Sequence, residues 1–146
     1  MLHAGLLYDF SVDVVPALRK LKPKAHIEMF QAIDCTIVNP VFMLSFLGPV
    51  ILLPTGVFLT RGEPGFGLLL AATIVQIVGS NAVTVAGHLP LNAELMKVDT
   101  AQLSEAKAEK IRTKFQGPSS RWVWLHTVRT LSSTAALALV LAALAA

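Results

Sequence analysis

The sequence predicts an all-α integral-membrane protein: a four-helix bundle with one or two amphipathic helices at the membrane surface. Hydrophobic residues make up 54% of its 146 positions and charged residues 14%, which is too apolar for a water-soluble domain of this length. The apolar positions form runs of membrane-spanning length, and the basic residues lie in short segments between them. Lipid headgroups therefore explain the net charge of +3, and we expect one membrane domain over residues 1–146 and no nucleic-acid partner.

The first predicted span, residues 2–18, is short, because a membrane helix needs about 20 residues, and it carries Asp9 and Asp13. We interpret it as a short or truncated span. It does not resemble a signal peptide, since it lacks a basic start and acidic residues interrupt it. A basic cluster then leads into a predicted amphipathic helix over residues 24–37, which we place among the lipid headgroups.

The second predicted span covers residues 39–60. Asn39 is a favourable capping residue and Pro40 a favourable first-turn residue. Pro49 and Pro54 predict kinks, and we expect neighbouring helices to satisfy the carbonyl groups that these prolines leave free.

The third predicted span covers residues 66–89, where Pro90 is expected to end it, and its polar residues recur every three or four positions. These polar residues are Thr73, Gln76, Ser80, Asn81, Thr84 and His88. One interpretation is hydrogen bonding between packed helices, and the other is the wall of a polar cavity. A second amphipathic helix is predicted over residues 104–116, followed by a fourth span over residues 122–145 with small residues such as Ser132 for close helix contact.

The start of the fourth span places Trp122, His126 and Arg129 on one helical face. A cation inside lipid costs roughly 2.5 to 3.5 kcal/mol on insertion scales, so Arg129 should face the bundle and be paired. Asp13 is the preferred partner in this interpretation, and Asp9 is the fallback.

The distribution of Lys and Arg predicts the orientation. The first connection carries four, the second one and the third six, counted up to Arg121. The positive-inside rule then places both termini outside and the polar loops in the cytoplasm. Polar residues of all four helices share one depth near the cytoplasmic ends under this topology, which predicts a pocket. The residues expected at that depth are Asp13, Asn39, His88, Trp122, His126 and Arg129.

Such a pocket suits a flat, polar aromatic substrate that must lose a proton. His126 is the candidate general base, Arg129 and Asn92 are the candidates for stabilising the resulting enolate, and Trp122 could stack on a ring. The other candidate substrate-binding residues are His88, Asn39, Asn81 and Asp13. The alternative is a non-catalytic binding or scaffold protein, in which these side chains serve helix packing alone.

A metal-dependent oxidase is a further alternative. His88, His126 and Asp13 would form a two-histidine, one-carboxylate set suited to iron, and copper or a haem between the two histidines are weaker variants. His3 is expected to lie too far toward the opposite face to take part. The sequence contains no phosphate-binding loop, cysteine pair or serine-nucleophile motif.

Four segments carry a resemblance to a known family. They are Ser11-Val-Asp-Val-Val-Pro-Ala-Leu, Met29-Phe-Gln-Ala-Ile followed by Asn39-Pro40, Gly87-His-Leu-Pro-Leu-Asn92, and Trp122 to Thr130. Together they resemble the anthrone oxygenase-like family of small four-span membrane proteins. The resemblance implies oxidation of an anthrone to an anthraquinone with dioxygen in a polyketide pathway, without a flavin or nicotinamide cofactor. The family's polar positions correspond to Asn39, Asn92, Trp122, His126 and Arg129.

Two features depart from the family pattern. The first helix begins later than in the family, and His88 stands where many relatives have asparagine. The second departure could shift the role of base to His88 or add a ligand. The partners that the resemblance implies are an aromatic small molecule, dioxygen and the lipid bilayer, and a homo-oligomer is left open.

Overall fold

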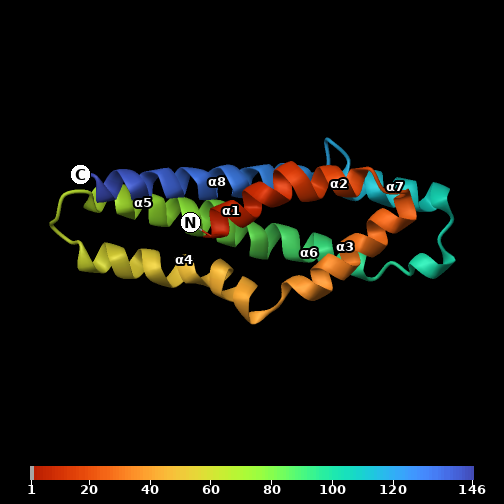
Figure 1. Ribbon diagram of the computed structural model, residues 1–146, viewed down its shortest axis with the longest axis horizontal. Coiled ribbons are helices and arrows are strands. Elements are labelled where there is room, and N and C mark those ends of the chain that lie inside the picture. Colours follow the sequence, from red (N-terminus) through yellow and green to blue (C-terminus); the bar gives the residue numbers. More distant parts are fainter. Residues whose placement is uncertain (1) are drawn as a thin grey trace.

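The computed structural model describes residues 2–146, and helices joined by short connections account for nearly all of them (Figure 1). No strand occurs in this described part of the chain, so the prediction of an all-α fold is confirmed.

The first helix is continuous from residue 2 to residue 19. It consists of α1 (Leu2–Asp9), a π-helical segment η1 (Phe10–Val14) and α2 (Val15–Arg19). In Figure 1 it begins part-way along the molecule, well short of the end where α8 finishes. The amphipathic helix α3 (Pro23–Ile37) follows within two residues of the predicted bounds and packs against α7.

The middle of the chain forms α4 (Pro40–Leu59) and a single long helix from Phe66 to Met96. The long helix consists of α5 (Phe66–Gln76), the π-helical segments η2 (Ile77–Ala82) and η3 (Thr84–His88), and α6 (Leu89–Met96). The prediction that Pro90 ends this helix is wrong.

A change of winding explains how the chain passes Pro16 and Pro90, whereas Pro49 and Pro54 lie within the α-helix α4. The N–H of Leu89 bonds to the carbonyl of Thr84, five residues back, directly before Pro90. In the same way the N–H of Val15 bonds to Phe10, directly before Pro16. Proline cannot donate and its ring crowds the preceding turn, so a widened turn just ahead of it lets the helix continue.

The C-terminal third contains the short 3-10 helix η4 (Thr100–Gln102), α7 (Glu105–Gln116) and α8 (Arg121–Leu144). Ser104 caps α7, as predicted, by accepting a hydrogen bond from the N–H of Lys107 at 3.4 Å.

Three helical stretches of residues 2–146 are long and apolar enough to cross a membrane. They are Pro40–Leu59, Phe66–Met96 and Glu105–Leu144, the last including both α7 and α8. The helix over residues 2–19, which contains Asp9, Asp13 and Arg19, is not among them. Helices long and apolar enough to span a membrane are thus confirmed, whereas a bundle of four spans is not.

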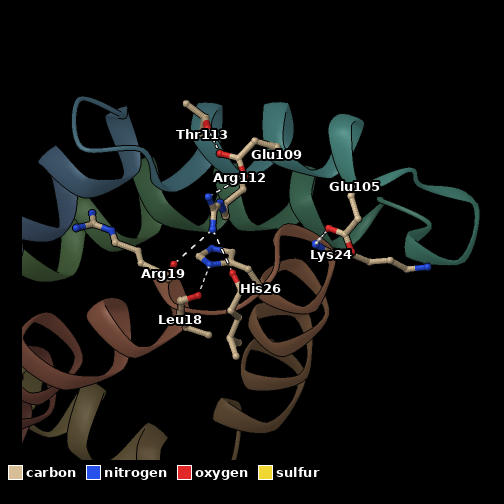
Figure 2. A network of polar contacts seen from close by, with 9 residues as sticks. Leu18, Arg19, Lys24, His26, Glu105, Glu109, Arg112 and Thr113 are labelled. Carbon is tan, nitrogen blue, oxygen red and sulfur yellow. Dashed lines mark hydrogen bonds and ion pairs between the residues drawn. The ribbon is translucent and has the colours of Figure 1, made fainter.

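The polar end of the molecule is held together by contacts among α2, α3 and α7 (Figure 2). Nη1 of Arg112 donates to the carbonyl oxygens of Leu21 at 3.2 Å and Arg19 at 3.4 Å, which satisfies backbone groups at the end of α2. His26 is fully buried and its Nδ1 donates to the carbonyl oxygen of Leu18 at 2.9 Å. Burial lowers the pKa of His26 from its ordinary value, although the bond to Leu18 opposes the shift.

The predicted stripe of polar residues on the third span does face inward. Thr73, Gln76, Ser80, Asn81 and His88 are all buried. Opposite this stripe, α8 approaches so closely that a Cβ atom added at Gly79 would lie 2.6 Å from the Cβ of Ser132. Small residues therefore allow the contact between these helices, as predicted for Ser132.

Candidate functional site

His126 is buried on the inner face of α8, and both of its ring nitrogens are hydrogen-bonded. Nε of Arg129 donates to its Nδ1 at 3.0 Å. Because an arginine N–H can only donate, Nδ1 of His126 must be unprotonated, and the ring proton of the neutral imidazole is on Nε2. Nε2 donates to Oγ of Ser11 at 2.8 Å, and that hydroxyl donates onward to the carbonyl oxygen of Leu7 at 2.9 Å.

Arg129 is half-buried and directed into the bundle, as predicted, but its predicted carboxylate partner is wrong. The one ion pair within residues 2–146 joins Arg112 to Glu109. Nη1 of Arg129 instead donates to Oγ1 of Thr84 at 3.5 Å. Asp13 and Asp9 are both exposed. Neighbouring residues on a helix point in different directions, and the first helix turns Ser11 toward α8 and Asp13 away from it.

His88 lies beside His126 in the same layer. Its ring is 2% exposed and is perpendicular to the ring of His126, with 6.1 Å between the centroids. Neither ring nitrogen of His88 has a hydrogen-bond partner in the described part of the chain. The two histidines therefore converge, but Asp13 is not with them. No group of three His, Cys, Asp or Glu residues among residues 2–146 is placed to hold a metal ion.

Trp122 connects this layer to the polar end of the molecule. Its Nε1 donates to Oδ1 of Asn92 at 3.0 Å, and Nδ2 of Asn92 donates to Oδ1 of Asp34 at 2.7 Å. One face of its indole stacks on His126 at a centroid distance of 5.0 Å. The other rings around it are Phe10, Phe30, His88 and Phe115. Side chains of the protein therefore cover much of the indole surface of Trp122 that was expected to stack on a substrate.

Two of the predicted site residues do not join this layer. Asn39 is exposed and caps α4, where its Oδ1 accepts from the N–H of Phe42 at 3.0 Å. Asn81 is buried and its Nδ2 donates to the carbonyl oxygen of Phe46 at 3.0 Å, one turn before Pro49. This bond reaches the turn before Pro49, but the carbonyl group that Pro49 leaves without a donor is that of Ser45, four residues earlier. His88, Trp122, His126 and Arg129 lie together, whereas Asn39 and Asp13 are exposed and do not face them.

Two residues that the sequence did not single out are Ser11, which is half-buried, and His3, which is buried. Ser11 was visible as a polar residue in an apolar run, but nothing in the sequence distinguished it from Asp13. His3 is 5% exposed and its Nε2 lies 3.0 Å from Oγ of Ser80, so it belongs to the buried polar residues of the bundle.

A cavity near these residues lies to one side of the histidines. It has a volume of about 460 Å³ and is lined by residues of α1, α4, α5 and α8. His3, Gln76 and Ser133 line it, whereas His88, His126 and Arg129 do not. A smaller groove of about 210 Å³ lies between α6, α7 and α8 and is lined by Trp122, with Lys114 and Arg121 nearby.

The arrangement provides two elements of acid–base chemistry. A neutral imidazole is held in one tautomer, and a guanidinium that lacks a carboxylate partner within residues 2–146 lies against it. A proton acceptor next to an uncompensated cation is suited to removing a proton from carbon while an oxyanion forms.

A family model described as anthrone oxygenase matches residues 42–139. The matched segment contains His88, Asn92, Trp122, His126 and Arg129, while His3 and Ser11 precede it. No curated protein and no solved structure matches the chain.

Proposed function

Because the chain belongs to the anthrone oxygenase family, we propose that it is a membrane-embedded oxygenase that oxidises an anthrone-like polycyclic phenol to a quinone with dioxygen. The direct contact between buried His126 and Arg129 carries this proposal, since it pairs a proton acceptor with a cation free to bind an oxyanion. Family membership supports an oxidoreductase, and the apolar helices support a substrate that partitions into lipid.

The proposed reaction begins at the methylene carbon of the anthrone. That carbon loses a proton to Nδ1 of His126, and the electron pair is delocalised onto the carbonyl oxygen. Arg129 moves from His126 to the carbonyl oxygen of the bound anthrone, which frees Nδ1 before the proton is lost and places the cation at the developing oxyanion. The carbanion then bonds to dioxygen, and the resulting peroxide takes up the proton held by His126. Loss of one water molecule from the hydroperoxide leaves a second carbonyl group, so that anthrone and dioxygen give anthraquinone and water.

Asn92 and Trp122 are proposed to bind the same substrate from the polar end. Oδ1 of Asn92 accepts a hydrogen bond from Trp122, and one N–H of its side-chain amide donates to Asp34. The second N–H of that amide is left for the oxyanion. Asp34 thus orients the amide, and the amide orients the indole.

His88 is the competing candidate for the base. Its ring nitrogens are free of hydrogen bonds to residues 2–146, whereas Nδ1 of His126 becomes available only after Arg129 moves. The two histidines lie close enough that either could meet the same substrate.

One observation favours a non-catalytic scaffold as the second candidate. His126 bonds across helices to Ser11 and lines neither of the two cavities, which is what a purely packing role would require. The scaffold function predicts no effect of small molecules on stability in detergent.

Oxygen uptake with an anthrone, measured on purified protein above the spontaneous rate, tests the proposal. We expect His126→Ala to reduce the rate by about 100-fold or more, which is the usual contribution of a general base. Thr127→Ala is the matched control, because Thr127 is exposed on the same helix and bonds only to the carbonyl oxygen of Val123. A full rate in His126→Ala together with a large loss in His88→Ala would move the base to His88.

The proposal includes an orientation: both termini outside, the α3 and α7 segments in the cytoplasm, and the helix over residues 2–19 as the fourth span. Labelling of single cysteines placed at residues 62 and 107 tests it. Residue 62 should react from the outside and residue 107 only after the membrane is opened.

A further inference from the structure

We propose that the cavity between α1, α4, α5 and α8, called the lateral cavity below, binds a planar polycyclic aromatic phenol whose oxygen atoms contact Ser133 and His3. The cavity volume of about 460 Å³ is in the range of small-molecule sites, which measure about 300 to 1,000 Å³. The identity of the ligand rests on the proposed function, while the existence of the site rests on the geometry alone.

The lateral cavity opens toward lipid. Leu2, Leu44 and Leu52 line it and are 74%, 74% and 70% exposed, so they form a rim on the outer surface of apolar helices. His3, Gln76 and Ser133 are at most 5% exposed and form its floor. An apolar ligand could therefore pass from the bilayer to a polar floor without crossing water.

The floor contains a hydroxyl group that requires a partner. Ser133 is 1% exposed, and its Oγ has no hydrogen-bond partner among residues 2–146. A buried polar group left unpaired costs about 1 to 3 kcal/mol, so an oxygen atom of a ligand at this position would remove that cost. Gln76 differs from Ser133 because its Nε2 already donates to Oδ1 of Asn81 at 3.0 Å.

The floor also adjoins the residues of the proposed reaction. Ser133 follows Arg129 by one turn of α8, and Ser80, which bonds to His3, precedes Thr84 by one turn. Thr84 in turn accepts a hydrogen bond from Arg129. A substrate oxygen at Ser133 would therefore lie on the Arg129 side of the cavity, with its rings between α1 and α4.

An acyl chain is the competing occupant, and two features favour the phenol. A hydrocarbon chain would leave the hydroxyl of Ser133 unpaired, whereas a phenol or ketone oxygen would pair it. Gly48 and Pro49 of α4 line one wall of the cavity. No side chain projects from this wall at Gly48, where an added Cβ atom would meet no other atom within 4 Å. A rigid ring system can lie against such a wall.

The test is the binding of 1,8-dihydroxyanthraquinone to the full chain in lipid nanodiscs, measured by equilibrium filtration against empty discs. Gly48→Leu fills the cavity, and we expect it to weaken binding at least tenfold. Gly67→Leu is the matched control, because Gly67 is also a helical glycine with open space around it but does not line the cavity. We expect Ser133→Ala, which keeps the cavity open, to weaken binding about fivefold.

The outcomes separate this inference from the proposed function. If Gly48→Leu binds the anthraquinone as tightly as Gly67→Leu does, the lateral cavity is not the site, even when oxygen uptake is normal. If Gly48→Leu alone loses binding while the wild type shows no oxygen uptake, the site stands and the oxygenase proposal fails. Retention of a co-purified lipid that the anthraquinone cannot displace would overturn the inference in favour of an acyl chain.

Discussion

The half of the molecule that contains α3 and α7 packs differently from the half that contains α4 and α5. The first half holds a cluster of large buried side chains, including Leu18, Phe30 and Trp122. In the second half α4 has no buried residue, and the segment η2 that follows α5 touches α8 through small residues such as Gly79 and Ser132. In Figure 1 α4 lies at one side of the α5 and α8 pair.

This difference shows that side chains fill the space between helices in one half of the molecule and leave a cavity in the other. The α3 and α7 half resembles the core of a water-soluble protein, in which large side chains fill the space between helices. The α4 and α5 half leaves the lateral cavity open at a rim of exposed leucines, so lipid or a ligand must complete it. The buried histidines His88 and His126 do not line this cavity, which lies beside them.

The largest expected effect comes from removing the centre of the packed half. Trp122→Ala should lower stability by about 3 to 5 kcal/mol, because Trp122 is 2% exposed and its loss leaves a cavity among aromatic rings. Thermal unfolding in detergent measures the effect. Trp124→Ala is the control, since Trp124 lies two residues further on α8 and is 65% exposed. Equal losses in both variants would show that the burial of Trp122 is not what stabilises the packed half.

A smaller effect is expected at the close helix contact in the other half. A Cβ atom at Gly79 would lie 2.3 Å from Oγ of Ser132, so Gly79→Ala should cost about 1 to 3 kcal/mol by forcing η2 and α8 apart. Thermal unfolding of the double variant with Ser132→Gly should recover most of this loss, because the obstructing side chain is then absent. No recovery would mean that Ser132 is not what limits the approach. Gly67→Ala, with open space around it, should not destabilise.

The smallest effect concerns pH at the polar end. Burial lowers the pKa of His26 in the folded protein, whereas in the unfolded chain it titrates near its ordinary value of about 6.5. As pH falls below that value, the unfolded chain gains a proton that the folded protein does not, so stability decreases toward pH 5. Unfolding of His26→Gln should depend less on pH between 7 and 5. An identical pH dependence in both proteins would exclude His26 as a contributor.

The sequence alone determined the local structure of this protein. Apolar run length, capping residues such as Ser104 and the three-to-four spacing of polar residues predicted the helices over residues 40–59 and 105–116 and the inward face of the third span. The shared face of Trp122, His126 and Arg129 was likewise predictable. These features depend on residues within a few turns of one another, so the order of residues is sufficient to specify them.

Only the tertiary structure decided which groups meet across helices. The partner of His126 is Ser11 and not the nearby Asp13, because rotation of the first helix, with its π-helical turn before Pro16, depends on how it packs against α8. The lateral cavity depends on how α1, α4, α5 and α8 pack against one another. Relative rotation and offset of helices arise from the packing of the whole bundle, and no local pattern of residues encodes them.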